Sequence, residues 1–133
     1  MRTLFADTFY YIALLSSTDA AHTRAVEFTR TYNELMVTTV WIITELADGM
    51  ADGSTRQAFM NFYDAVRVDP QVSVVQPEQY LFDEGLELYR NRLDKDWSLT
   101  DCISFVVMQR QGIAEALTGD HHFEQAGFKA LLR

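Results

Sequence analysis

Four acidic residues lie at widely separated points of the chain, and each adjoins or lies within an apolar segment: Asp7, Glu45, Asp101 and Asp120. Carboxylates gathered in one place repel one another unless a cation lies among them. Their hard oxygen ligands suit Mg²⁺ or Mn²⁺ better than Zn²⁺. Clusters of this kind orient and activate water for phosphodiester cleavage. The chemistry to consider is therefore metal-assisted hydrolysis.

Each aspartate taken alone has a simpler explanation, because aspartate is a favoured residue at the start of a helix. Asp7 and Asp120 each precede a predicted helix, and Asp101 lies three residues after Ser98 in S-L-T-D, which matches a capping box. Glu45 lies in a strongly apolar helix, where a partly buried carboxylate needs a cation or a hydrogen-bond donor. If that helical face is exposed, Glu45 needs neither. The conjunction of the acids, not any single one, indicates a metal site.

The segments around these acids alternate between predicted strands and predicted helices. The short β-prone runs are residues 3–7, 72–76, 113–118 and 128–132. This alternation predicts an α/β fold, a three-layer α/β/α sandwich with a mostly parallel central sheet, in one domain over residues 1–133. Ligands of such sheets bind beyond the carboxyl ends of the strands, which is where Asp7 and Asp120 are expected.

Two details of the predicted elements depend on hydrophobic periodicity alone. Apolar residues at helical spacing predict one helix over residues 19–35, followed by a β-prone break at 36–39. In the helix that follows Pro77, the expected buried stripe consists of Phe82, Leu86, Tyr89 and Leu93.

Composition and charge exclude several classes of protein. The net charge of −8 is unusual for a protein that binds nucleic acid, but a bound divalent cation can attract phosphate to an acidic surface. The chain has neither the G-x-x-x-x-G-K-[ST] nor the G-x-G-x-x-G pattern of nucleotide-binding loops. His22, His121 and His122 make no convincing zinc set, because the adjacent histidines at 121 and 122 are expected to diverge and the chain has a single cysteine, Cys102.

The same features indicate where the protein acts. A lone cysteine suits a reducing cytoplasm. No apolar run approaches the roughly 18–20 residues that a membrane span requires. The apolar run at residues 9–15 is at the short limit for a secretory signal, and Asp7 interrupts it. We therefore expect a cytoplasmic protein with no membrane partner.

Four segments resemble those of the PIN-domain nuclease family, in particular the VapC-type toxins of bacterial toxin–antitoxin pairs. They are LFADTFYYIALL (4–15), TTVWIITELADGM (38–50), DKDWSLTDCISFVVM (94–108) and TGDHHFEQAGF (118–128). They occur in the family's order and span nearly the whole chain, and the third and fourth are the most specific. The resemblance makes Asp7, Glu45, Asp101 and Asp120 the acidic metal ligands and catalytic residues.

The resemblance also implies an activity and partners. It implies an endoribonuclease dependent on Mg²⁺ or Mn²⁺, a small antitoxin protein that blocks the site, and a homodimer. It gives Thr118 the role of positioning Asp120 or a phosphate. It suggests Asp96 as an accessory carboxylate, although a solvated loop charge is the simpler interpretation of that residue.

Arg90, Arg92 and Lys95 flank the third segment and are candidates for contacts with RNA phosphates, although cations near a helix end also offset the helix dipole. Two alternatives stay open: a PIN-type nuclease for RNA processing without a toxin role, and a catalytically silent PIN-like binding module. A phosphate-receiving regulator is disfavoured, because the run at 72–76 ends in Gln76 where an acceptor aspartate would be needed.

Overall fold

A parallel sheet of five strands, in the order β3-β2-β1-β4-β5, forms the centre of the computed structural model, which describes residues 1–133. The strands are β1 (Thr3–Ala6), β2 (Leu35–Thr39), β3 (Val72–Val75), β4 (Glu115–Leu117) and β5 (Lys129–Ala130). Every pair of neighbouring strands is parallel. Because an all-parallel sheet presents apolar side chains on both faces, it needs helices on both faces.

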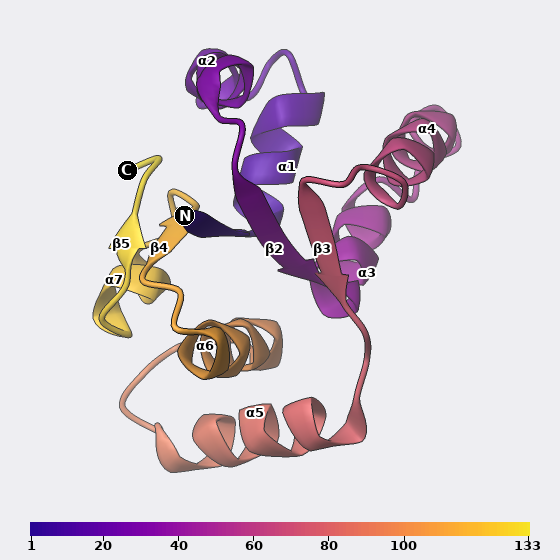
Figure 1. Cartoon of the computed structure of the whole chain (residues 1–133). Helices are drawn as coiled ribbons and strands as arrows, with labels where there is room; N and C mark the ends of the chain where they lie inside the picture. The colour runs from indigo at the N-terminus through magenta and orange to yellow at the C-terminus, as the bar shows by residue number, and fades with distance from the viewer.

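Seven helices supply that cover: α1 (Thr8–Leu15), α2 (His22–Thr31), α3 (Val40–Gly49), α4 (Arg56–Val66), α5 (Gln79–Asn91), α6 (Leu99–Gln111) and α7 (His121–Gln125). Figure 1 shows α1 and α2 on one side of the sheet and α5 and α6 on the other. The predicted α/β/α sandwich around a parallel sheet is confirmed. No helix combines the length and the hydrophobicity that a membrane-spanning segment needs.

The core lies on both sides of β1 and around α6. The side chains of Leu4, Phe5 and Ala6 in β1 are fully buried. Helix α6 is buried continuously from Cys102 to Met108, as its apolar sequence on every face predicts. A buried helix of this kind fixes the position of whatever its first turn carries.

The prediction of one helix over residues 19–35 is wrong at its carboxyl end. Helix α2 ends at Thr31, and Leu35–Thr39 is the strand β2, which lies between β1 and β3. The helical period continues past the helix because the Tyr32 side chain turns back to the strand, where its hydroxyl donates to the Leu35 carbonyl at 2.7 Å. Periodicity alone therefore cannot locate this boundary.

The predicted buried stripe of α5 is also wrong in part. Tyr89 and Leu93 are exposed, whereas Leu81 and Gly85 are buried. A Cβ atom added to Gly85 would lie 2.4 Å from Cγ1 of Ile103, so α5 approaches α6 most closely at a residue without a side chain. A hydrophobic pattern does not register such a contact, because glycine adds nothing to it.

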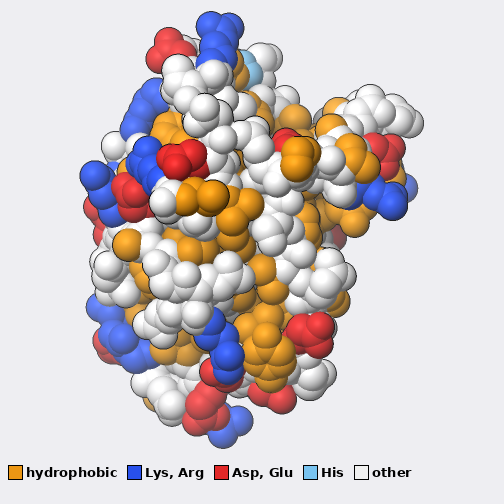
Figure 2. Space-filling model, in the orientation of Figure 1, with side chains coloured by type: hydrophobic (Ala, Val, Ile, Leu, Met, Phe, Trp, Pro, Cys, Tyr) orange, Lys and Arg blue, Asp and Glu red, His pale blue; other side chains and the backbone are white.

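Charges of both signs are interspersed over the face shown in Figure 2, between apolar and neutral side chains. That face has no extended basic surface, in keeping with the net charge of −8. The strands β1 and β4 lie side by side and run in the same direction. Their carboxyl ends therefore bring Asp7 and the segment 118–120 to one edge of the sheet.

A candidate metal-dependent active site

One hollow of about 670 Å³ collects all four acids that the sequence predicted. It is called the acidic hollow below and is lined by Asp7, Thr8, Phe9, Ile12, Glu45, Gly49, Asp96, Ser98, Asp101, Asp120 and His122. The acids come from the end of β1, from α3, from the first turn of α6 and from the loop after β4. The expected convergence is therefore present, and the catalytic role of these residues stays a prediction.

Asp7 is the most buried of the acids, with 5% of its surface exposed. One of its oxygens, Oδ2, accepts a hydrogen bond of 2.7 Å from the Thr118 hydroxyl. The pKa of Asp7 is raised from 3.8 to about 7, chiefly by burial and also by the negative charges of Asp101 and Glu45, against the opposing effect of the hydrogen bond from Thr118. A cation in the hollow would favour the ionised form of this carboxyl.

Thr118 connects the two acids at the strand ends. It is fully buried, its hydroxyl donates to Asp7, and the same oxygen accepts from the backbone N–H of Asp120 at 3.0 Å. Thr118 lies behind the hollow rather than on its surface, since it is absent from the lining. The role in positioning Asp120 that the resemblance suggested thus has a direct structural counterpart.

Glu45 enters the hollow from α3. The residue is exposed, so the interpretation as an exposed helical face is the right one, yet that face is turned toward the other acids. The Thr8 hydroxyl, in the first turn of α1, donates to Oε1 of Glu45. This bond fixes the carboxylate on the wall of the hollow.

Asp101 acts as a helix cap and also faces the hollow. Its backbone N–H donates to Oγ of Ser98 at 3.0 Å, and its Oδ2 accepts from the Ser98 N–H at 3.2 Å, which is the predicted capping box. The same Oδ2 lies 3.2 Å from Nδ1 of His122. Burial, with the nearby charge of Asp120, raises the pKa of Asp101 against the opposing effects of Ser98 and His122. Capping and a place in the site are therefore compatible.

The other two aspartates differ as caps. Asp120 caps α7, because its Oδ1 accepts from the His122 N–H at 2.9 Å. Asp7 stands at the N-cap position of α1 but makes no side-chain cap bond. Its carboxylate is committed to Thr118 and the hollow instead, so the simpler explanation fails for this residue.

Sequence reasoning missed part of the lining and misjudged the histidines. Phe9, Ile12 and Thr8 line the hollow, and their nearness to Asp7 on one helix was the available signal. The rings of His121 and His122 do not diverge: their centroids lie 4.4 Å apart. His122 also has Asp101 as a hydrogen-bond partner.

The donors in the hollow fit a hard divalent cation. Four carboxylates face a common space, where burial and mutual repulsion raise the pKa of Asp7 and of Asp101, and a cation would oppose both effects. No three of these four carboxylates have oxygens that all lie within 4.8 Å of one another. Such spacing suits Mg²⁺, which keeps several of its waters and takes few protein ligands.

A second hollow adjoins the first and carries two of the predicted basic residues. It is called the adjoining hollow below and is lined by Tyr89, Arg92, Leu93, Lys95, Asp96, Trp97, Ser98 and Leu99. Asp96 and Ser98 line both hollows, so the two are neighbours. The Arg92 guanidinium lies 4.8 Å from the ring centroid of Trp97 and pairs with Asp94 at 3.0 Å. Arg90 lines neither hollow and pairs with Glu87 at 3.7 Å.

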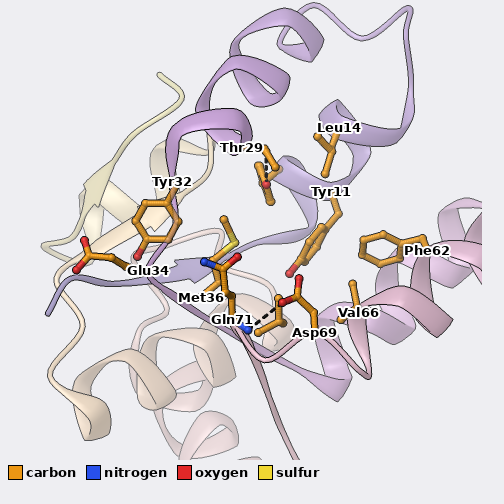
Figure 3. Close-up of a pocket in the computed structure, with 12 residues that line it drawn as sticks. Tyr11, Leu14, Thr29, Tyr32, Glu34, Met36, Phe62, Val66, Asp69 and Gln71 are labelled. Carbon is orange, nitrogen blue, oxygen red and sulfur yellow. Dashed lines mark hydrogen bonds between the residues drawn. The ribbon is translucent and has the colours of Figure 1, made fainter.

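An apolar pocket of about 140 Å³ lies on the other side of α1. It is lined by Tyr10, Tyr11, Leu14, Thr29, Tyr32, Glu34, Met36, Phe62, Val66, Asp69, Gln71 and Val72. Figure 3 shows the Tyr11 ring between Phe62 and the strands, with its hydroxyl toward Asp69. That hydroxyl is buried and has no hydrogen-bond partner.

The PIN domain family model matches residues 4–129, and the chain belongs to the PIN domain family. Among solved structures, it is similar to VapC20 from Mycobacterium tuberculosis, described as a toxin that cleaves the Sarcin-Ricin loop, with 25% identity and a TM-score of 0.89 over 98% of this chain and 99% of that one. With the family match, this similarity confirms the prediction of a VapC-type PIN nuclease.

Two further structures share the fold at lower identity. One is a toxin–antitoxin complex from Klebsiella pneumoniae, with 14% identity and a TM-score of 0.63 over 89% of this chain and 87% of that one. The other is FitAcB from Neisseria gonorrhoeae, with 12% identity and a TM-score of 0.68 over 98% and 96%. Curated protein sequences yielded no match.

Proposed function

We propose that this chain is the endoribonuclease toxin of a toxin–antitoxin pair and that it hydrolyses RNA with Mg²⁺ or Mn²⁺ held, directly or through the ion's waters, by Asp7, Asp101, Asp120 and Glu45. The observation that carries the proposal is the convergence of these acids from four separate segments on one hollow at the carboxyl edge of the sheet. We further propose that residues 1–133 are one domain, and that the protein acts as a homodimer in the cytoplasm.

The residues of the acidic hollow have different proposed roles. A bound Mg²⁺ or Mn²⁺ would polarise the phosphate and lower the pKa of a coordinated water. Thr118 sets the relative position of Asp7 and Asp120 through its two hydrogen bonds. Glu45, held by its hydrogen bond from Thr8, reaches the hollow from α3 and is the member we assign to orienting the attacking water.

The decisive experiment is cleavage of RNA by the parent and by Asp101→Asn. We expect the variant to be slower by more than about 100-fold. Replacing a residue that only hydrogen-bonds to a metal ligand often lowers activity 10- to 100-fold, and replacing a ligand should cost more. Chelator should stop the parent, and Mg²⁺ or Mn²⁺ should restore it. Asp64→Asn, which alters an exposed carboxylate of α4 outside the hollow, is the matched control. Equal rates for parent and Asp101→Asn would refute the assignment.

The RNA to test first is the Sarcin-Ricin loop, which the similar toxin VapC20 is described as cleaving. We propose that the strand leaves the acidic hollow past Asp96 into the adjoining hollow, where Arg92 and Lys95 contact phosphates. Replacing both with glutamine should raise KM for RNA. It should also make RNA binding less dependent on salt concentration, by the amount expected for the loss of about two phosphate contacts. Arg90→Gln is the control, and we expect little change from it, since Arg90 lines neither hollow.

We propose that the antitoxin anchors a large apolar side chain, flanked by Lys or Arg, in the apolar pocket. Aromatic rings enclose the space, and Glu34 and Asp69 lie on its lining. Phe62→Ala should weaken antitoxin binding at least about 10-fold, the scale expected of an aromatic contact at the centre of an interface, while RNA cleavage persists. Met60→Ala is the control, because Met60 is exposed on the same helix and lies outside the pocket.

The two alternatives predict other outcomes. For a nuclease of RNA maturation, expression should not arrest growth, and no small partner should neutralise cleavage. For a silent binding module, calorimetry should detect no binding of Mg²⁺ or Mn²⁺. Growth arrest relieved by the partner favours the toxin over both.

A further inference from the structure

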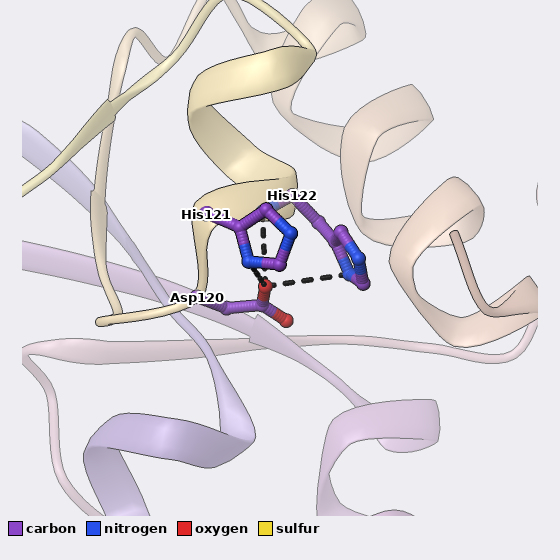
Figure 4. A group of neighbouring side chains, drawn as sticks. All are labelled: Asp120, His121 and His122. Carbon is purple, nitrogen blue, oxygen red and sulfur yellow. Dashed lines mark hydrogen bonds and ion pairs between the residues drawn. The ribbon is translucent and has the colours of Figure 1, made fainter. Parts of the chain in front are cut away.

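The first turn of α7 carries a second set of metal-binding groups with a different chemistry. The atom Oδ1 of Asp120 lies 3.6 Å from Nδ1 of His121 and 3.3 Å from Nδ1 of His122. These three residues are called the α7 triad below, and their ligand atoms all lie within 4.8 Å of one another. Figure 4 shows both imidazole rings turned toward the Asp120 carboxylate.

The local backbone explains how three consecutive residues converge. Asp120 is the N-cap of α7 and has an extended backbone, with φ −80° and ψ 122°, whereas His121 and His122 are helical. Because Oδ1 of Asp120 accepts from the His122 N–H at 2.9 Å, the carboxylate folds over the first turn. It therefore meets both rings from outside the helix.

The spacing suits a small four-coordinate ion. Zinc–nitrogen distances of 2.0–2.1 Å in a tetrahedral site place neighbouring ligand atoms about 3.4 Å apart. The separations of 3.6 and 3.3 Å from Asp120 lie on either side of that value. The His121 side chain is 57% exposed, so an ion can enter from solvent and a water can complete its coordination.

We propose that the α7 triad is a binding site for a borderline transition-metal ion such as Zn²⁺ or Co²⁺. Imidazole nitrogen selects such ions, whereas the carboxylates of the acidic hollow select hard ions such as Mg²⁺. The two sites share Asp120, and His122 also lies 3.2 Å from Asp101. An ion on the triad therefore withdraws Asp120 from the hollow and inhibits Mg²⁺-dependent cleavage. This inhibition rests on the proposed function, whereas binding of the ion to the triad does not depend on it.

The test is a titration of protein without a histidine tag with Co²⁺ in Mg²⁺-free buffer, because Mg²⁺ in the hollow would compete for Asp120. We expect one equivalent of Co²⁺ to bind with the visible absorption of a four-coordinate site and without a sulfur band, since the only cysteine, Cys102, is buried. Zn²⁺ should bleach that absorption. His121→Ala should weaken Co²⁺ binding at least about 10-fold. Because the His121 side chain is exposed, we expect the variant to keep the fold of the parent, which thermal melting checks.

Two control variants separate the α7 triad from the acidic hollow. Asp7→Asn removes an acid of the hollow and should leave Co²⁺ binding unchanged, as should Glu124→Gln on the same helix. If Co²⁺ binding survives His121→Ala, or is lost in Asp7→Asn, the ion occupies the hollow and the proposal is overturned. In the cleavage assay, Zn²⁺ should inhibit the parent at least 10-fold more than His121→Ala. A chain that cleaves no RNA refutes the proposed function, whereas the Co²⁺ titration still decides the triad.

Discussion

Helix α1 lies between the acidic hollow and the apolar pocket. Comparing the two shows which side of the helix stabilises the fold and which side lowers its stability. Thr8, Phe9 and Ile12 face the acidic hollow, whereas Tyr10, Tyr11 and Leu14 face the apolar pocket. Both sides of the helix are thus in use, which explains why its sequence is apolar nearly all round. One eight-residue helix carries groups for the proposed chemistry and groups for packing.

Burial has opposite consequences on the two sides. In the acidic hollow it disfavours the charged form of Asp7 and raises the pKa of that carboxyl. In the apolar pocket, the Tyr11 ring lies 4.9 Å from Phe62 and 5.1 Å from Tyr10, and burial of these rings stabilises the fold. Functional sites commonly lower stability in this way, and the surrounding core offsets the loss.

The largest expected effect concerns Asp7, whose pKa is raised from 3.8 to about 7 in the folded chain. Between these values the folded chain holds a proton that the unfolded chain has released. Its stability therefore falls as the pH rises through this range, by about 4 kcal/mol in all. Asp7→Asn is uncharged at every pH and keeps an oxygen for the Thr118 hydroxyl.

In metal-free buffer, urea unfolding should show Asp7→Asn more stable than the parent at about pH 8, with the difference vanishing near pH 4. Asp64→Asn should follow the parent at both values, because Asp64 is exposed. If the unfolding free energies of Asp7→Asn and the parent differ by the same amount across this range, ionisation of buried Asp7 does not lower the stability of the folded chain as we describe.

An intermediate effect is expected at Thr118, which joins the two acids behind the hollow. Thr118→Val keeps the shape but leaves Asp7 and the Asp120 N–H without their partner, so we expect a loss of about 2 kcal/mol in unfolding free energy. RNA cleavage should fall as well. Thr118→Ser retains the hydroxyl and should recover most of both, and a serine variant as impaired as the valine variant would point to packing instead.

The smallest effect is expected in the apolar pocket and has the opposite sign. The Tyr11 hydroxyl is buried without a partner, so Tyr11→Phe should stabilise the chain by up to about 1 kcal/mol. The neighbouring Tyr10 hydroxyl pairs with Oγ1 of Thr29 at 2.5 Å, so Tyr10→Phe should destabilise it by about 1 kcal/mol. Thermal unfolding of the two variants compares them directly; equal effects would remove the distinction between the two tyrosines.

Much of the fold was predictable from the sequence because its helices and strands keep their expected periods. The strand β2 was the exception. Tyr32 and Leu35 continue the helical spacing of apolar residues beyond Thr31, where α2 ends, and into the start of β2. The close approach of α5 to α6 was also out of reach, because it depends on Gly85, whose lack of a side chain carries no hydrophobic signal.

Asp7 and Asp120 were predictable because strand ends of a parallel sheet meet at one edge, whereas Glu45 and Asp101 were assigned to the site through the resemblance to the PIN-domain family. The convergence of His121 and His122 was not predictable, because it depends on the extended backbone of Asp120 immediately before a helix. The hydrogen bond from Thr8 to Glu45 was also out of reach, because it joins two helices whose relative placement no local pattern encodes.

The double role of Asp101 bears on how an inactive form of this protein should be made. Its carboxylate closes the capping box at the start of α6, the most continuously buried helix. Alanine at this position would remove both a proposed metal ligand and the cap of the central helix, so a loss of toxicity in a genetic screen would not distinguish the two causes. Asparagine retains an oxygen for the Ser98 N–H, which makes it the substitution that removes charge while leaving the scaffold intact.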